Sequence, residues 1–404
     1  MVERMLGHFV RWDGVYFAAI ARDGYTYEHI GAFFPLYPLL VRVLARGVAR
    51  LACGTLQRAS CIVLAGALLS NACFVLAALV LRALGRAVLG RRGAGAAVAD
   101  RAALLFCASP ASIFFSALYT ESLFALLSLL GLWALAARPW PRALAPAALA
   151  LAAATATRSN GAVSCGFVLY AAAATVVPLD RVLCGTLPLR TALATLFRDR
   201  TATASTLRRA FCAGLAAVPA CAAVLAPVVA VQVHAAHVWC APAVRAAANP
   251  LSAWCDAPRV LGAVPNYYGH VQAAYWGQGF LHYWRAEQLP NFALYAPMLA
   301  LVAHGTAAFF VPSRTHKAGS TAAPRLPPRA VVYVVHAAAL ALFALLCMHV
   351  QVGTRLLAAA APAVYWYAAQ LTLASRRGAA LVLAYFASFF VVGTILFTNF
   401  FPWT

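Results

Sequence analysis

The chain has 404 residues, of which 64% are hydrophobic and only 10% are charged, and its formal net charge is +21. A soluble domain has roughly 45–50% apolar residues, so the composition excludes an ordinary soluble protein and indicates several membrane spans. The basic residues fall in short clusters between apolar stretches and not in long runs with interleaved aromatic residues, which excludes a nucleic-acid partner.

Residues 11–38 concentrate charged and aromatic side chains in a chain that has few charges elsewhere. Such a segment suits a membrane surface, where aromatic rings lie at headgroup level and polar groups reach water. Asp13 follows Trp12 and precedes an apolar helical run, so it is either the cap of that helix or a carboxylate base, and the two roles are compatible. Glu28 and His29 are either solvated loop residues or groups that bind acceptor hydroxyls or phosphate.

Ten hydrophobic segments follow along the chain. We expect each of them to be a membrane-spanning helix, which makes residues 1–404 a single all-α, polytopic integral membrane domain. Several are shorter than the roughly 20 residues of an upright transmembrane helix, so tight turns are expected at membrane depth. The segments are 59–81, 102–118, 121–137, 143–157, 162–178, 211–233, 290–312, 330–348, 356–374 and 379–398.

The connections between these segments alternate between two kinds. One kind is basic, as in residues 181–209 and 313–328, and the other is polar without being strongly basic, as in residues 234–289. By the positive-inside rule the basic set is cytosolic, with 313–328 as an ordinary linker, and the other set faces the opposite compartment together with residues 1–58. Because an N-terminus on that side without a signal peptide is unusual, we expect one more helix before Met1.

Charged and polar residues mark three of the non-cytosolic connections. Glu121 begins a span, where its charge either complements the helix N-terminus or binds an amine or serves as a second acid. Arg158 interrupts a long apolar run, and the segment with His349, Gln351 and Arg355 repeats this pattern on the same side. A single arginine there is explained by lipid headgroups, but two on one face favour a phosphate site, because guanidinium binds phosphate with two hydrogen bonds.

The 234–289 connection holds many aromatic residues and few charges, so we expect an ordered lid at the membrane interface. Cys240 and Cys255 are its only cysteines, and either a disulfide or two free thiols fits an oxidising compartment. The chain has no CxxC pair and no His-rich ligand spacing, so we expect no metal site.

Six blocks of sequence, in order from about residue 3 to the end, resemble the PIG-V family, GPI mannosyltransferase II. They are RWDGVYF…ARDGYTYEHIGAFFPLYP, FCASPASIFFSALYTESLFALL, ATATRSNGAVSCGF, YWGQGFLHYWRAEQLPNFALYAPML, HVQVGTRLLAAAAPAVYWY and NFFPWT. The resemblance implies a multi-pass enzyme of the GT-C class in the endoplasmic reticulum membrane, with its active site built from luminal loops. Such an enzyme adds the second, α1,6-linked mannose from dolichol-phosphate-mannose to the GPI-anchor precursor. Family members usually have a transmembrane helix before the RWD block, and this sequence departs from that pattern.

Carried over by position, the luminal carboxylate of the family falls on Asp13, which we expect to be the base of an inverting single displacement. No DxD motif is present, and a monophosphate leaving group needs only cationic donors, so we expect no metal and no other cofactor. The remaining expected site residues are Arg158, His349 and Arg355 for the donor phosphate, and Glu28, His29, Glu121 and Gln351 for the acceptor.

Three other functions stay open on the sequence: a GT-C mannosyltransferase with a different acceptor, a lipid transporter or flippase, and a non-catalytic assembly subunit. A transporter is expected to carry charges near the centres of its spans or to have paired broken helices, whereas the charges here gather at the ends of spans. A small membrane partner subunit is also left open.

Overall fold

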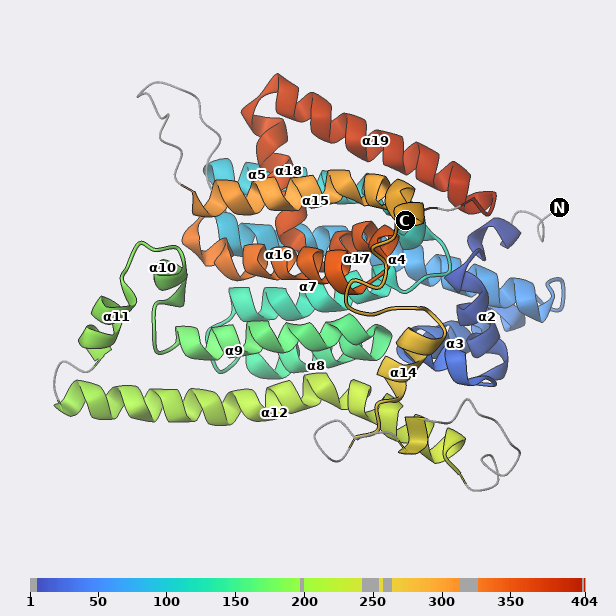
Figure 1. Ribbon diagram of the computed structural model, residues 1–404, viewed down its shortest axis with the longest axis horizontal. Coiled ribbons are helices and arrows are strands. Elements are labelled where there is room, and N and C mark those ends of the chain that lie inside the picture. Colours follow the sequence, from blue (N-terminus) through green and yellow to red (C-terminus); the bar gives the residue numbers. More distant parts are fainter. Residues whose placement is uncertain are drawn as a thin grey trace.

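The computed structural model describes residues 6–196, 200–241, 254–256, 264–311, 326–401 and 403, and these residues form a helical bundle (Figure 1). The expected all-α class is confirmed for this part of the chain. The expected cytosolic linker 313–328 lies outside the described residues except for its last three positions. The longer helices are α2 (Asp13–Asp23), α3 (Leu36–Leu51), α4 (Arg58–Leu89), α5 (Gly93–Cys107), α7 (Glu121–Ala137), α8 (Leu144–Thr157), α12 (Arg200–Trp239), α15 (Leu289–Phe310), α16 (Val331–Cys347), α18 (Pro362–Ala374) and α19 (Arg376–Thr398). The shorter ones are α6 (Ser112–Ser116), α9 (Cys165–Ala174), α10 (Leu179–Leu183), α11 (Leu189–Leu196), α14 (Tyr267–Ala274) and α17 (Gly353–Ala360).

Length and composition support fewer membrane spans than the ten expected. Within the described residues, α4, α12, α15, α16 and α19 are long and apolar enough to cross a membrane, and the bent pair of α17 and α18 is a sixth candidate. Helices α7, α8 and α9 are apolar but shorter. At about 1.5 Å per residue, the 17 residues of α7 extend roughly 26 Å, less than the hydrocarbon thickness of about 30 Å.

Two prolines divide segments that hydropathy alone reads as continuous. The 102–118 segment is broken after α5, where Pro110 lies in the turn that leads to α6. The 356–374 segment bends by 83° between α17 and α18. Ala361 is extended there, with φ −117° and ψ 90°, because a residue before proline avoids the helical region. The bend ends α17 early and makes it a short buried helix beside α7.

Helix α5 begins before the hydrophobic segment that predicts it. Its first turns carry Asp100, which pairs with Arg82 of α4 at 2.7 Å and with Arg86 at 2.9 Å. Because these partners satisfy the charge, the helix extends through a stretch that hydropathy assigns to a loop.

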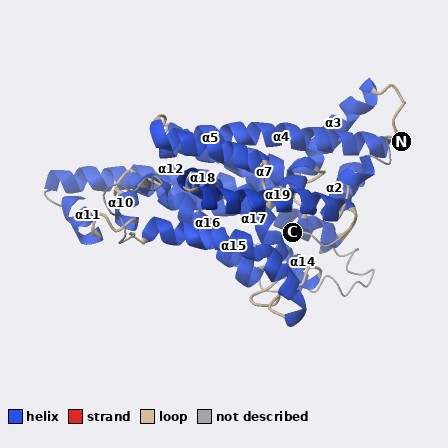
Figure 2. Ribbon diagram, turned by 90° about the horizontal axis from the view of Figure 1, so that it is seen from above, coloured by secondary structure: helices blue, strands red, loops and turns tan. Residues whose placement is uncertain are grey.

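The main core surrounds α18, in which Pro362 to Gln370 are all buried. A helix that is buried on every side must be covered by neighbours, and α5, α15, α16 and α19 contact it. A smaller core joins α8, α9 and α12, where buried alanines let the helices approach closely. The long helices α4 and α12 run along the long axis in both views (Figures 1 and 2).

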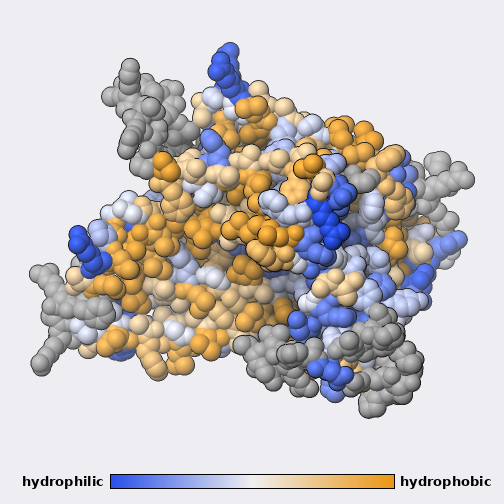
Figure 3. Space-filling view, viewed as in Figure 1, coloured by the Kyte–Doolittle hydropathy of each residue, from blue (hydrophilic) through white to orange (hydrophobic). Residues whose placement is uncertain are grey.

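The two kinds of connection lie at opposite ends of the bundle. Helices α10 and α11 lie at one end, and α2, α3 and α14 lie at the other in both views (Figures 1 and 2). Figure 3 shows apolar side chains over the middle of the bundle and polar ones gathered at the end of α2 and α14. The segments of the non-cytosolic set therefore meet at one end, which is what a single active site requires.

Candidate active site

An unusual turn presents Asp13. Asp13 is the first residue of α2 and makes no capping hydrogen bond, so it does not cap the helix as one interpretation of the sequence had it. The preceding residue, Trp12, has φ 52° and ψ −124°, a conformation that a side-chain-bearing residue rarely adopts. A backbone held in this region needs support from its surroundings.

Tyr119 supplies that support. Its hydroxyl accepts a hydrogen bond from the Asp13 amide at 3.0 Å and donates one to the Arg11 carbonyl at 3.1 Å, so it bridges the backbone on both sides of Trp12. The Leu118 amide also donates to the carbonyl of Phe9 at 3.1 Å. Burial and the nearby Asp13 carboxylate raise the pKa of Tyr119, which keeps its hydroxyl protonated and able to donate.

Four charged side chains form the ion-pair cluster: Asp13, Arg355, Glu121 and Arg158. Arg355 donates from its terminal nitrogen Nη2 to Asp13 Oδ2 at 2.8 Å, and its Nε lies 3.8 Å from Glu121 Oε1. Arg158 also pairs with Glu121 Oε1 through Nη1. The Glu121 side chain is fully buried, whereas 25% of the Asp13 side chain is exposed. The cluster therefore has a buried acidic residue between two arginines and one accessible carboxylate at its edge.

Four elements far apart in the sequence bring the cluster together. Asp13 and Glu121 are the first residues of α2 and α7, Arg158 follows the last residue of α8, and Arg355 lies in the first turn of α17. The carboxylates thus sit at helix N-termini, where the helix dipole favours negative charge. The expected phosphate residues Arg158 and Arg355 meet at Glu121.

Aromatic faces and one hydroxyl complete the surroundings of the two arginines. The Arg355 guanidinium lies 5.1 Å from the centre of the Phe114 ring, and the Arg158 guanidinium donates to Thr120 Oγ1 at 3.2 Å. Such contacts hold a guanidinium in place without removing its charge.

Glu28 fastens the lid segment, residues 264–289, to the N-terminal segment. Its carboxylate accepts hydrogen bonds from Trp254 Nε1 and from the Tyr275 hydroxyl at 2.8 Å, and its carbonyl accepts one from the Tyr267 hydroxyl. The Glu28 side chain is buried, so its hydrogen bonds are made inside the protein and not at the solvent-exposed surface. Gly31 allows this docking, because a Cβ there would lie 1.8 Å from the Tyr267 oxygen.

The Glu28 carboxylate also acts on its partner electrostatically. Burial and the hydrogen bond to Glu28 raise the pKa of Tyr275 to about 12, so the phenol remains a donor at neutral pH. His29, next in sequence, packs its ring against Tyr16 and Tyr275 at centroid distances of 5.8 and 5.6 Å.

His349 and Gln351 belong to a separate polar group around Tyr283. The Tyr283 hydroxyl donates to Gln351 Oε1 at 3.0 Å, and the His349 ring stacks on the Tyr283 ring at 4.5 Å. Burial lowers the pKa of His349 below its usual value, so the ring is neutral at pH 7. In that state the ring carries no charge, and its one N–H donates to the backbone carbonyl of Trp276.

Cys240 and Cys255 form a disulfide in the structure, with Cα atoms 5.7 Å apart. The bond ties the end of α12 to the residue after Trp254. Ser159 adds a second link, since its hydroxyl lies 2.7 Å from that of Tyr268 in the lid segment. Within the described residues, no group of three or more His, Cys, Asp or Glu side chains is arranged to hold a metal ion.

The prediction from sequence missed the aromatic residues that position the site. Tyr119, Trp254 and Tyr283 each hold a predicted residue through a hydrogen bond or a ring contact. Tyr119 stands two residues before Glu121, so its place beside a polar motif was the available signal. Nothing in the spacing of Trp254 or Tyr283 indicates the residue that each one contacts.

The sequence matches the family described as "Mannosyltransferase (PIG-V)" over residues 1–404. A protein of Cricetulus griseus and one of Homo sapiens, both named GPI alpha-1,6-mannosyltransferase 2, are each 32% identical to the chain, over 100% of it and 89% of the relative. GPI mannosyltransferase 2 of Drosophila pseudoobscura pseudoobscura is 33% identical, over 100% of this chain and 88% of the relative. No solved structure matches the chain significantly.

Proposed function

The chain belongs to the PIG-V mannosyltransferase family and is a glycosyltransferase of GPI-anchor biosynthesis, and we propose that it transfers the second mannose, in α1,6 linkage, from dolichol-phosphate-mannose to the GPI precursor. Full-length similarity to relatives named GPI alpha-1,6-mannosyltransferase 2 supports this acceptor and linkage. The ion-pair cluster carries the chemistry of the proposal, since it combines an accessible carboxylate with two guanidinium groups.

We place the reaction on the luminal side of the endoplasmic reticulum membrane, in a bundle of the GT-C class. The basic connections are expected to be cytosolic, and α2, which begins at Asp13, lies at the other end of the bundle from α10 and α11 (Figure 1). The disulfide at the end of α12 fits an oxidising lumen.

Asp13 is the proposed base. It takes the proton of the acceptor 6-hydroxyl while that oxygen forms a bond to the mannose C1 and the bond from C1 to the dolichyl phosphate oxygen breaks. This single displacement converts a β-linked donor into an α-linked product. Arg355 orients Oδ2 of Asp13, and Oδ1 has no hydrogen-bond partner among the described residues, so Oδ1 is available for the proton.

The two arginines stabilise the leaving phosphate. In the resting cluster two guanidinium groups balance two carboxylates. As the phosphate gains negative charge, Asp13 loses its own by taking the proton, and Arg355 is then free to donate to the phosphate oxygens. Glu121 stays in contact with both arginines and keeps them oriented.

Polar groups outside the ion-pair cluster complete the proposed binding sites. His349 contacts the donor phosphate, and His29 and Gln351 contact acceptor hydroxyls. Their half-buried side chains at the lid segment support these roles, because such groups keep a polar atom available without the cost of burying a charge.

Complementation of cells that lack the second GPI mannosyltransferase tests the proposal. The chain should convert the one-mannose precursor into the two-mannose precursor, which lipid analysis detects. Asp13→Asn should slow transfer by about 10²–10⁴-fold, the usual contribution of a positioned base. Asp23→Asn is the matched control, because Asp23 ends the same helix and pairs with exposed Arg22.

Two results would reject the proposal. Accumulation of the one-mannose precursor by a chain that reaches the membrane would reject the acceptor. Full transfer by the Asp13→Asn chain would reject Asp13 as the base and leave the acceptor intact.

A further inference from the structure

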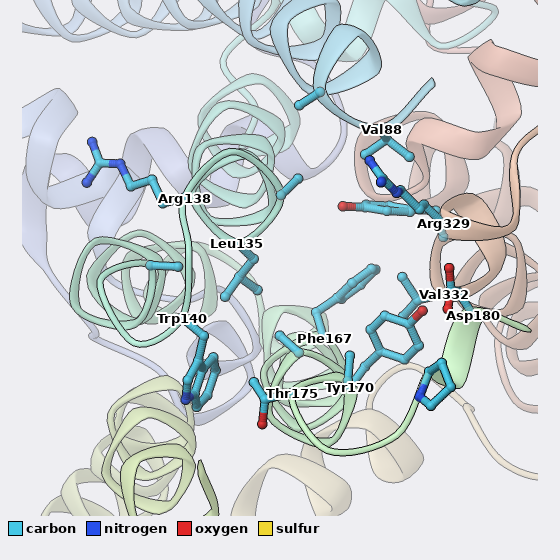
Figure 4. Close-up of a pocket in the computed structure, with 17 residues that line it drawn as sticks. Val88, Leu135, Arg138, Trp140, Phe167, Tyr170, Thr175, Asp180, Arg329 and Val332 are labelled. Carbon is cyan, nitrogen blue, oxygen red and sulfur yellow. The ribbon is translucent and has the colours of Figure 1, made fainter. Parts of the chain in front are cut away.

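A cavity of about 350 Å³ opens at the end of the bundle away from Asp13. Ligand pockets commonly have volumes of about 300–1,000 Å³. It lies among the ends of α4, α7 and α9 and the beginnings of α8, α10 and α16, and Figure 4 shows its lining residues. None of these residues belongs to the ion-pair cluster or to the lid segment. The cavity is therefore separate from the proposed active site.

One face of α9 forms the long wall of this cavity. Phe167, Tyr170, Ala171, Ala174 and Thr175 line it, and their spacing of three or four residues places them on one side of the helix. From Phe167 to Thr175 the helix rises roughly 12 Å at about 1.5 Å per residue. The cavity is thus long enough for several methylene groups.

Its polarity changes along that length. The inner part is lined by apolar side chains, with Val88, Leu135 and Phe167 among them. Of the charged residues, Asp180 lies in the first turn of α10 and Arg329 lies just before α16. A cavity with an apolar interior and charged groups at one end matches an amphipathic ligand.

The two charges stand on the same side of the cavity and do not pair. In Figure 4, Arg329 extends into the space above, and Asp180 lies below it beside the hydroxyl of Tyr170, whereas Arg138 on the opposite side points away. No ion pair joins Asp180 to Arg329 in the part of the chain that the structure describes. A ligand that carries both charges would give each residue a partner.

We propose that this cavity binds one glycerophospholipid whose headgroup carries both a phosphate and an amine. Arg329 donates to the phosphate, and Asp180 accepts from the ammonium beside the ring and hydroxyl of Tyr170. The apolar inner part takes the first portion of an acyl chain. Basic pockets between helices on the cytosolic side are places where lipid headgroups bind, and Asp180 gives this one a preference for a zwitterion over an anion.

Lipid binding to the purified, delipidated full-length chain tests this proposal. Phosphatidylethanolamine should bind about tenfold or more tightly than phosphatidic acid, because a charge-assisted hydrogen bond to the amine is lost in the second lipid. Asp180→Asn should remove this preference, and Arg329→Gln should weaken both lipids about tenfold, while Arg92→Gln at the same end should change neither. Glycerophosphoethanolamine, which has the headgroup without acyl chains, should bind far more weakly than the lipid.

A pair of alanine variants tests the place of binding. Ala174→Trp fills the cavity and should abolish binding, whereas Ala173→Trp adds the same side chain to an exposed position of α9 outside the cavity and should not. Equal binding of the two lipids, a preference that survives Asp180→Asn, equal binding of the headgroup alone, or equal effects of the two tryptophans would each overturn the proposal. Native mass spectrometry of the bound lipid reads all of these outcomes.

Discussion

Replacing Glu121 with glutamine tests whether the ion-pair cluster is organised around its buried acid. Glu121 is fully buried and contacts both Arg158 and Arg355. Glutamine keeps the shape of the side chain but removes its charge, so two largely buried guanidinium groups would share the single carboxylate of Asp13. We expect lower stability and a loss of transfer.

The magnitude follows from the burial of the partners. Removing one member of a buried ion pair costs about 3–5 kcal/mol, because the other charge is left without compensation. The Arg158 and Arg355 side chains are 17% and 15% exposed, so water relieves only a small part of this cost. The free energy of unfolding should fall by about 3 kcal/mol or more in the Glu121→Gln chain.

A second variant separates folding from chemistry. Glu121→Gln combined with Arg158→Gln restores the balance of charges and should recover most of the lost stability. If Arg158 binds the donor phosphate, the double variant should remain deficient in transfer, with a raised KM for the donor. Denaturation in detergent and steady-state kinetics measure the two quantities on the same preparations.

Two outcomes would refute this reasoning. A Glu121→Gln chain with unchanged stability would mean that the arginines find other partners and that Glu121 does not organise them. A double variant with normal transfer would show that Arg158 is dispensable for the donor, and the proposed phosphate site would then rest on Arg355.

Two further predictions concern residues that hold the site from outside the cluster. Tyr119→Phe should lower kcat with little change in the donor KM, because it releases the backbone around Asp13 and leaves both arginines in place; a change in KM alone would contradict a positioning role. Glu28→Gln should speed hydrogen exchange in residues 264–289 without abolishing transfer. The glutamine NH2 group cannot accept a hydrogen bond, so either Trp254 or Tyr275 loses the acceptor that Glu28 provides. Exchange at the original rate would show that Glu28 does not hold the lid segment.

The end of the bundle at which each polar residue lies was easier to predict from the sequence than the residues that it contacts. Alternating basic and non-basic connections placed Asp13, Glu121, Arg158 and Arg355 on one side before any contact was known, and the structure brings all four into one cluster. That prediction succeeds because helices that cross a bundle return their connections to alternate ends. Hydropathy could not indicate that Glu121 lies at the centre of the cluster, because an acidic residue in the first turn of a helix is equally well explained by its interaction with the helix dipole.

Local pattern also failed where tertiary packing decided the outcome. Glu28 and His29 have the composition of a solvated loop, yet Trp254 and Tyr275 cover Glu28 from a segment more than 200 residues away. The sequence shows Pro362, but a hydropathy average does not respond to a single proline and predicts a straight span where the structure bends. In both cases the deciding partner lies outside the window that a sequence pattern describes.

The placement of these partners explains how a membrane protein can keep charges at its proposed active site. Every carboxylate of the cluster lies at the start of a helix, and every arginine of the cluster pairs with a carboxylate, so the charges are balanced before substrate binds. A phosphate that enters such a site meets guanidinium groups already oriented by their acids, and little reorganisation is needed. In the proposed mechanism, proton transfer to Asp13, the partly exposed acid of the cluster, changes the partner of Arg355 at the step where the phosphate gains its charge. The same contact would then position the base and stabilise the leaving group in turn.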